Sequence, residues 1–269
     1  MRDAAPRRTA RQRATLRLSH GQPQPQHQQP RAARAPLFTL RAIALDGELT
    51  RSNSATVRAN ALPLLAGNFF SIDLARGRAA FESVPWVRRA TVRRVWPNRL
   101  AVTLEEHHAA ALWQGASDGG VATDRLLNDH GEIFEANLGD VEDESLVTLA
   151  GPDSASKSML AMWRRLTDSL APIQARIDAL KLSARGSWHA ELDSGAELEL
   201  GRGSEDEVVA RTQRFVRTLA RATQRFASAD GTSRVLLAAD LRHPDGYALR
   251  LRGVSTTSIA AAHGATTPR

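Results

Sequence analysis

The stretch that most constrains the fold runs from Asn68 to Glu106, because several independent local signals agree within it. Asp73 is a good helix N-cap, apolar residues follow at roughly helical spacing, and Pro85 ends the helix. Two alternating runs then flank the turn dipeptide Pro97-Asn98, which is typical of a β-hairpin. The pattern predicts a helix followed by a hairpin with one shared apolar face, comprising Ala90, Val92, Trp96, Leu100, Val102 and Leu104.

A unit of this size needs a further strand and helix to cover its apolar face. Phe38 to Leu45 alternates and ends at the turn Asp46-Gly47, which predicts a strand. Asn53 or Ser54 then caps a short helix that extends to about Leu65. Residues 37–106 therefore predict one compact β-α-α-β-β module.

The formal net charge of +7 belongs to residues 1–36, which hold eight arginines and a single acidic residue, Asp3. This segment is rich in Arg, Gln and Pro, and it is too poor in apolar residues to bury a core. We predict a disordered tail or a mistranslated one; a basic arm for nucleic acid or anionic lipid is the alternative. Because no aromatic residue is interleaved to stack on bases, we expect no nucleic-acid partner.

Residues 107–252 read as short strands with two helices, at about 156–170 and 205–226. The last two strands, 235–240 and 247–252, are joined across the turn His243-Pro244-Asp245-Gly246. Residues 253–269, rich in Thr, Ser and Ala, are predicted to form a flexible C-terminal tail.

Candidate catalytic patterns are weak. Ser154 and Lys157 match an S-x-x-K pattern, but its S-D-N and K-T-G partners are missing from the chain, so the serine is expected to cap a helix. The histidines have no metal-ligand spacing, and the absence of cysteine excludes disulfides and Cys-ligated metals. We therefore predict a protein that is not an enzyme, with no catalytic residues, cofactor, metal or small-molecule substrate.

Two surfaces are candidates for binding. The arginine cluster Arg88, Arg89, Arg93 and Arg94 is expected to be solvated or paired with Glu105 and Glu106 on the neighbouring strand; a phosphate or lipid headgroup site is the alternative. The closing strand, Tyr247 to Arg252, can accept a partner strand if it lies at a sheet edge. The alternative, in which the side chains of Arg250 and Arg252 block that edge, is equally compatible with the sequence.

Several motifs together resemble the FtsQ/DivIB family of bacterial division proteins. The first module resembles its POTRA domain, Asn128-Asp-His-Gly-Glu-Ile-Phe134 resembles the D-x-x-G-x-x-F element of its β-domain, with Asn128 in place of Asp, and Ala238–Arg242 with Asp245–Leu249 resembles its terminal strands. The POTRA motifs are Gly67-Asn-Phe-Phe70, Pro85-Trp-Val87, Val92-Arg-Arg-Val-Trp-Pro97, Asn98-Arg-Leu100 and Val102-Thr-Leu-Glu-Glu106. The resemblance spans about 37–252 and implies an α+β fold: an N-terminal POTRA module (β-α-α-β-β, 37–106) followed by a mostly antiparallel β-domain with two helices (107–252).

The resemblance also implies a non-enzymatic divisome scaffold on the periplasmic face of the inner membrane. Such a scaffold links early and late division proteins and binds the FtsB–FtsL pair by strand addition at its last strands. Carried over to this sequence, the partner-binding residues are His243, Asp245, Gly246, Tyr247, Arg250 and Leu251. The alternative is a POTRA-containing outer-membrane assembly or secretion factor.

One feature departs from the family pattern, in which a transmembrane helix precedes the POTRA module. The Arg/Gln/Pro-rich segment 1–36 occupies that place here. Our hypothesis is a wrong start codon or an upstream frameshift. An in-frame apolar segment of roughly 20 residues in the upstream DNA is the expected finding, and its absence would reject the hypothesis.

Overall fold

The computed structural model describes residues 14–17, 40, 42–47, 49–52, 57, 59, 61, 69–70, 72–115, 124–142, 144–224, 226, 235–243 and 245–254. The described residues divide into two compact units. Unit 1 lies within Met1–Ala110 and Arg125–Ser145, and unit 2 within Ala111–Asp124 and Leu146–Arg269. Among the described residues, no helix combines the length and hydropathy needed to cross a lipid bilayer.

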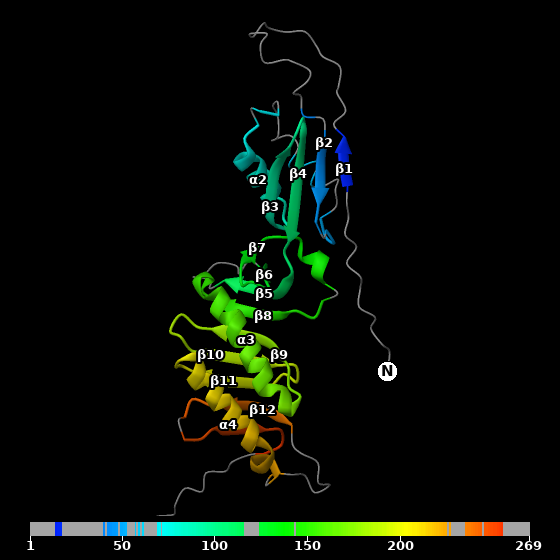
Figure 1. Cartoon of the computed structure of the whole chain (residues 1–269). Coiled ribbons are helices and arrows are strands. Elements are labelled where there is room, and N and C mark those ends of the chain that lie inside the picture. The colour runs from blue at the N-terminus through cyan, green and yellow to red at the C-terminus, as the bar shows by residue number, and fades with distance from the viewer. Residues whose placement is uncertain are drawn as a thin grey trace, which may run out of the picture. The chain divides into compact units, whose positions relative to one another are not determined.

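The described elements of unit 1 include the predicted first strand, second helix and closing hairpin in the predicted order (Figure 1). Its strands are β1 (Ala14–Arg17), β2 (Ala42–Asp46), β3 (Val87–Val95) and β4 (Arg99–Glu106), and they form a sheet in the order β1-β2-β4-β3. The pairs β1–β2 and β3–β4 are antiparallel, and β2 runs parallel to β4. β1 lies within the predicted tail 1–36, and the rest of that tail lies outside the described residues, as does 255–269.

The helix α2 (Leu74–Glu82) begins where the sequence predicts. The Asp73 carboxylate accepts the backbone N–H groups of Ala75 and Arg76 at 2.8 and 3.2 Å, which satisfies two of the donors that a helix start leaves open. Most of the earlier predicted helix, Asn53–Leu65, lies outside the described residues. Val57, Ala59 and Ala61 within it are helical.

The core of unit 1 lies between this sheet and its helices. The predicted apolar face is largely confirmed, since Ala90, Leu100, Val102 and Leu104 are all buried and Val92 packs against them. Trp96 is the exception, because its side chain is 76% exposed. It follows the last residue of β3, so the strand alternation that assigns it to the apolar face no longer applies there.

The strands β6 (Asp124–Asn128) and β7 (Ile133–Phe134) form an antiparallel hairpin. The fully buried Asn128 side chain organises this turn: its oxygen accepts the N–H groups of His130 and Glu132 at 3.0 and 2.8 Å. An aspartate would make the same two hydrogen bonds, so this replacement keeps the turn geometry. The short 3-10 helix η4 (Leu138–Val141) follows.

This segment packs against the first module within unit 1. The Trp86 indole N–H donates to the Asp140 carboxylate at 2.8 Å, and its ring meets the Phe134 ring edge-on at 5.3 Å. Arg88 donates to the Glu132 carboxylate at 2.7 Å. These contacts explain why residues 125–145 group with the first module although they follow it by about 20 residues in the sequence.

Unit 2 contains a mixed sheet in the order β13-β12-β11-β10-β9-β8-β5. Its strands are β5 (Ala109–Gly115), β8 (Val147–Gly151), β9 (Ile177–Leu182), β10 (Trp188–Leu192), β11 (Glu197–Gly201), β12 (Leu236–Asp240) and β13 (Ala248–Leu251). The pairs β5–β8, β8–β9 and β11–β12 are parallel, whereas β9–β10, β10–β11 and β12–β13 are antiparallel.

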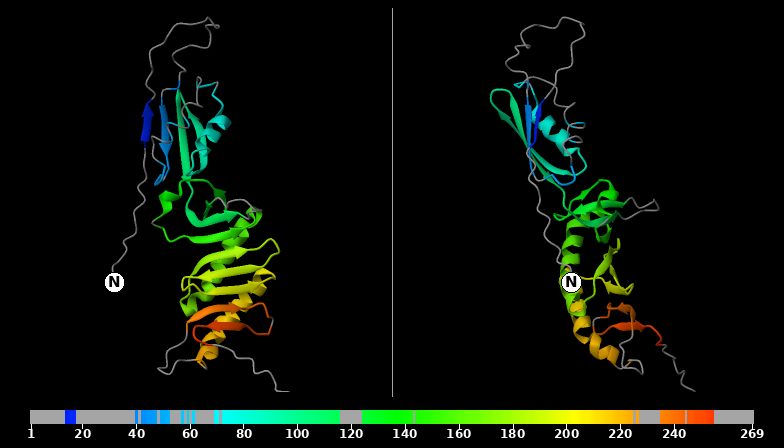
Figure 2. Two further views of the ribbon diagram at one scale, coloured as in Figure 1. Left: turned by 180° about the vertical axis from the view of Figure 1, so that it is seen from behind. Right: turned by 90° about the vertical axis from the view of Figure 1, so that its right-hand side faces the viewer.

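Two helices explain the parallel pairs, because parallel neighbours need a long crossover connection. The helix α3 (Ser156–Leu170), flanked by the 3-10 helices η5 (Asp153–Ala155) and η6 (Ala171–Ile173), connects β8 to β9; α4 (Glu205–Gln224) lies between β11 and β12. Both helices lie on one side of this sheet (Figure 2). Their apolar faces and the sheet form the core of unit 2, in which Trp113, Leu149, Met159, Met162, Leu166, Leu180, Leu198 and Phe215 are fully buried.

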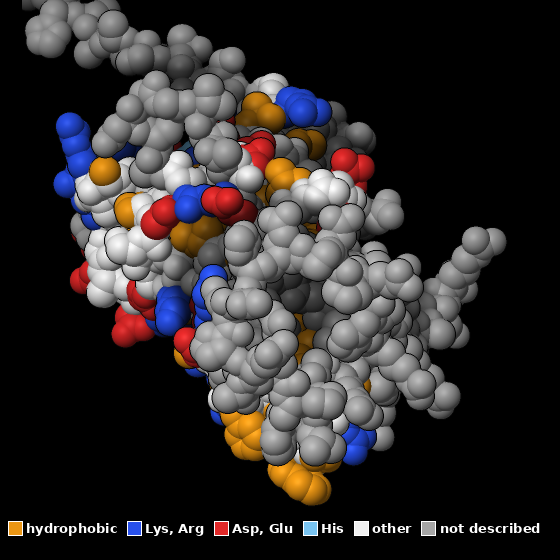
Figure 3. All heavy atoms as spheres, turned by 90° about the horizontal axis from the view of Figure 1, so that it is seen from above, with side chains coloured by type: hydrophobic (Ala, Val, Ile, Leu, Met, Phe, Trp, Pro, Cys, Tyr) orange, Lys and Arg blue, Asp and Glu red, His pale blue; other side chains and the backbone are white. Residues whose placement is uncertain are grey.

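The α+β class is therefore confirmed: a POTRA-like module followed by a large sheet with two helices. Figure 3 shows acidic and basic side chains side by side on the described part of the face seen from above. This mixture agrees with the near-zero net charge of residues 37–269.

Candidate functional site

The strand β13 is the last strand at one end of the sheet in unit 2, and β12 is its pairing partner among the described residues. The Arg252 N–H donates to the Val235 carbonyl at 2.9 Å, so residues of the same parity, Arg250 and Ala248, also direct their backbone groups toward β12. Leu249 lies between them and directs its N–H and C=O outward. Strand addition requires the closing strand to lie at a sheet edge, and β13 does so among the described residues.

Tyr247 fastens the start of β13 to α4. Its hydroxyl lies 2.7 Å from the Thr218 hydroxyl, and its ring meets the Phe215 ring edge-on at 5.3 Å. Phe215 is fully buried, so Tyr247 rests on the core while its side chain is only half-buried. The edge strand is thereby held at a fixed distance from the helix.

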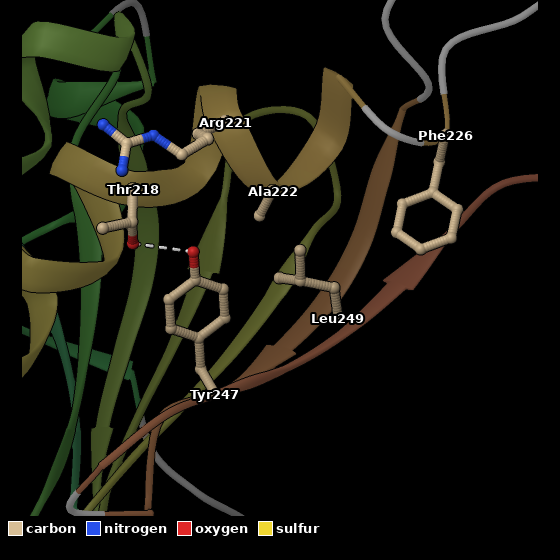
Figure 4. Close-up of a pocket in the computed structure, with 6 residues that line it drawn as sticks. All are labelled: Thr218, Arg221, Ala222, Phe226, Tyr247 and Leu249. Atoms are coloured by element: carbon tan, nitrogen blue, oxygen red, sulfur yellow. Dashed lines mark hydrogen bonds between the residues drawn. The ribbon is translucent and has the colours of Figure 1, made fainter.

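A cavity of about 440 Å³ opens between α4 and β13 (Figure 4). Its apolar side chains come from both elements: Ala222 from the helix, Leu249 from the strand, and Phe226 from just beyond the helix end. The Phe226 side chain is 45% exposed, so its ring is accessible from solvent. Polar atoms are supplied at one side by Thr218, Arg221 and the Tyr247 hydroxyl.

The partner-binding residues predicted from the sequence differ in their exposure and in the face of β13 on which they lie. His243 and Asp245 are exposed in the loop before β13, and a Cβ added at Gly246 would meet nothing within 4 Å. Arg250 is exposed on the opposite face of β13, 4.0 Å from the Glu197 carboxylate. Leu251 is 4% exposed, so its side chain belongs to the core and only its backbone faces the edge.

Sequence reasoning missed Leu249 and the contribution of α4. The predicted helix at about 205–226 ends at Phe226, and a large apolar residue at a helix end was the available signal. Nothing in the local sequence indicated which strand that residue faces.

Asp240 and Arg242 form a paired group at the end of β12. The Arg242 guanidinium donates to both carboxylate oxygens of Asp240, at 2.9 and 2.5 Å. These hydrogen bonds lower the pKa of Asp240 to about 2. At neutral pH the carboxylate is therefore ionised, and both of its oxygens accept hydrogen bonds from Arg242.

The catalytic alternative finds no support in the geometry. Ser154 and Lys157 are both exposed, and the residue that caps α3 is Ala155, which makes no side-chain capping bond. The expectation that this serine caps the helix is therefore wrong, because the 3-10 turn η5 continues directly into α3. Within the described ranges, no group of three or more His, Asp or Glu residues could hold a metal ion.

The arginine cluster on β3 is partly paired. Arg88 contacts Glu105 at 2.5 Å as well as Glu132, and the two hydrogen-bonded carboxylates raise the pKa of its guanidinium further. The expected pairing with Glu106 is wrong, because that side chain points to the other face of β4 and accepts backbone N–H groups of residues 50–52. Arg94 instead donates to three backbone carbonyls.

Comparison with known proteins covers both parts of the chain. A family model described as "Cell division protein FtsQ/DivIB, C-terminal" matches residues 111–242, and one described as "POTRA domain, FtsQ-type" matches residues 38–107. The chain is 40% identical over 220 residues to "Cell division protein FtsQ" of Burkholderia pseudomallei, covering 81% of this chain and 82% of that protein. Proteins of the same name from Thiomonas arsenitoxydans and Bordetella pertussis are 36% and 35% identical over 81% of this chain, covering 76% and 82% of their own lengths.

Proposed function

Because the chain belongs to the FtsQ/DivIB family of cell division proteins, a non-enzymatic family of the divisome, we propose that it recruits the FtsB–FtsL pair by accepting a strand at β13. In this proposal it connects early and late division proteins at the septum. It is held in the inner membrane by a single span, with its bulk in the periplasm. The FtsQ-type match of the POTRA module disfavours the alternative of an outer-membrane assembly or secretion factor.

The observation that carries the proposal is the combination of an open strand edge with an adjacent apolar cavity. An incoming strand can pair with the outward N–H and C=O of Leu249, and pairing of this kind gives affinity with little dependence on side-chain identity. One apolar side chain of the same partner can enter the cavity between α4 and β13, which supplies specificity.

The exposed residues at the two ends of this edge extend the surface. His243 and Asp245 precede the strand, and Arg250 presents a cation on the face away from the cavity. Leu251 contributes through its backbone alone, because its side chain is in the core. In this proposal the backbone of β13 defines where the partner binds, and the surrounding side chains adjust the affinity.

The test compares two substitutions at Leu249 in a binding assay with a purified FtsB–FtsL complex. Leu249→Ala removes the side chain from the cavity but keeps the outward N–H. Leu249→Pro removes both and also places a ring where the partner strand must approach. We expect the proline variant to bind roughly tenfold more weakly than the alanine variant, since one backbone hydrogen bond contributes about 1 kcal/mol and the ring adds steric conflict.

Arg217→Ala, on the exposed surface of α4, is the control and should bind like wild type. Circular dichroism must first confirm that Leu249→Pro keeps its fold, which is expected because Leu249 makes no ladder bond to β12. Equal affinities for the proline and alanine variants would reject strand addition at β13, whatever other surface binds the pair.

A further inference from the structure

Two aromatic side chains of unit 1 are largely exposed to solvent. Trp96, in the turn between β3 and β4, is 76% exposed, and Phe70 is 62% exposed. These are the two most exposed large hydrophobic side chains among the described residues. Every other tryptophan of the chain is buried or half-buried.

The two rings belong to the same end of the unit, although they are 26 residues apart in sequence. Arg94, two residues before Trp96, donates to the carbonyls of Phe69 and Ile72 at 2.9 and 2.6 Å and to that of Phe70 at 3.4 Å. The Phe69 and Phe70 rings also meet edge-on at 5.3 Å. The guanidinium therefore fastens the Phe70 segment to the strand that carries Trp96.

The charged side chains next to Trp96 in the hairpin are all basic. No acidic residue occurs between Trp86 and Leu104, a stretch that contains β3, the turn and all of β4 except its last two residues, Glu105 and Glu106. Arg93 and Arg99 are exposed on either side of Trp96, and Arg94 adds a third positive charge. The charges nearest to Trp96 along the hairpin therefore all have one sign.

We propose that this end of unit 1, defined by Phe70, Arg93, Trp96 and Arg99, docks on the surface of an anionic phospholipid bilayer. Tryptophan has its preferred position at the boundary between headgroups and acyl chains, where its apolar body and its polar N–H are both accommodated. Arginines around the rings meet the lipid phosphates, and each contributes on the order of 1 kcal/mol near such a surface.

The combination of exposed aromatic rings with flanking arginines favours a lipid bilayer over a protein partner. Trp96 lies in the turn of the hairpin, Phe70 lies in the segment that Arg94 holds against it, and exposed arginines flank the turn. This arrangement matches a surface that is anionic outside and apolar beneath. The proposal concerns unit 1 and does not depend on strand addition at β13.

The test is tryptophan fluorescence quenching by vesicles whose acyl chains carry bromine, made of phosphatidylglycerol and phosphatidylcholine or of phosphatidylcholine alone. Bromine quenches only tryptophans that enter the bilayer, so binding through the eight arginines of residues 1–36 does not by itself produce the signal. We expect the full-length protein to be quenched by the anionic vesicles. Trp96→Phe should lose this quenching, whereas Trp163→Phe, a matched removal of a half-buried indole in unit 2, should retain it.

The charge requirement is tested separately. Arg93→Gln combined with Arg99→Gln should raise the lipid concentration at half-maximal quenching roughly tenfold or more, whereas Arg217→Gln on α4 should leave it unchanged. Equal quenching of wild type and Trp96→Phe would overturn the proposal, as would equal quenching by neutral and anionic vesicles. An absence of quenching in wild type would also overturn it and would leave this end of unit 1 as a protein-binding surface.

Discussion

Glu106 offers the sharpest test of how the first module is held together. Its side chain is 4% exposed at the end of β4, and its carboxylate accepts three successive backbone N–H groups. The donors are those of Thr50, Arg51 and Ser52, at 2.7, 3.2 and 2.6 Å, and the Thr50 hydroxyl adds a fourth hydrogen bond at 3.0 Å. The carboxylate thus joins the segment after β2 to a strand more than 50 residues later.

The expected effect of Glu106→Ala on the free energy of unfolding follows from these four hydrogen bonds. A hydrogen bond to a charged group contributes about 1.5–3 kcal/mol, and a buried donor without a partner costs a further ~1–3 kcal/mol. Thr50 is exposed, so water can replace part of the loss, but Ser52 is 5% exposed. We expect a loss of ~3 kcal/mol in the free energy of unfolding of unit 1. Glu106→Gln, which keeps one acceptor oxygen, should cost about half as much.

Glu105 is the matched control, because it precedes Glu106 on the same strand and points to the opposite face. Its side chain is 48% exposed and pairs with Arg88, and exposed ion pairs contribute about 0–1 kcal/mol. Glu105→Ala removes the same atoms and should therefore cost under ~1 kcal/mol.

The measurement is urea unfolding followed by circular dichroism, combined with hydrogen exchange of peptides covering residues 49–52. Exchange is needed because the two units can unfold separately. In Glu106→Ala the amides of residues 50–52 should exchange much faster, while those of unit 2 should be unaffected. A cost of Glu106→Ala equal to that of Glu105→Ala would refute the assignment of stability to this carboxylate.

Two further predictions concern unit 1. The hydrogen bonds from Arg88 lower the pKa of Glu132 to about 2; since the folded-state pKa lies below the unfolded one, the stability from this group is present above pH ~4.5 and is lost as the pH falls toward 2. Acid titration of the unfolding free energy should show this loss in wild type and a smaller one in Arg88→Met; identical titrations would contradict the assignment. Gly47 has a φ of +147°, and a Cβ there would lie 2.3 Å from the Leu104 carbonyl oxygen, which β4 prevents from moving. Gly47→Ala should therefore cost at least ~2 kcal/mol in unfolding free energy, whereas Gly186→Ala, with a φ of +75° and open space around it, should cost only ~1 kcal/mol; equal costs would show that the contact with β4 is not what matters.

Local signals in the sequence were enough to place most of the elements. The N-cap at Asp73 and the turn at Pro97-Asn98 bound α2, β3 and β4 as predicted, because capping and turn chemistry act within a few residues. In unit 2 the predicted helix at about 156–170 coincides with α3. The combination of motifs likewise identified the family.

Pairing partners and the faces of individual side chains needed the tertiary structure. The three parallel strand pairs of unit 2 follow from crossovers through α3 and α4, and nothing in the alternation of a strand states its neighbour. Trp96 and Leu251 show the same limit at single positions: alternation assigned the first to the core and the resemblance assigned the second to the surface, yet the first is exposed and the second is buried.

The candidate site divides in the same way. The sequence by itself determined that the closing strand, Tyr247 to Arg252, is the place to examine, because it is the last strand and follows a Pro-Asp-Gly turn. Only the tertiary structure decided that β13 lies at an edge and that the backbone N–H and C=O of Leu249 point away from β12. It also decided that Thr218 of α4, and Phe226 just beyond the end of α4, line the adjacent cavity. The physical reason is that hydrogen bonding and capping are set by near neighbours in the chain, whereas an edge and a cavity are defined by which distant segments pack together.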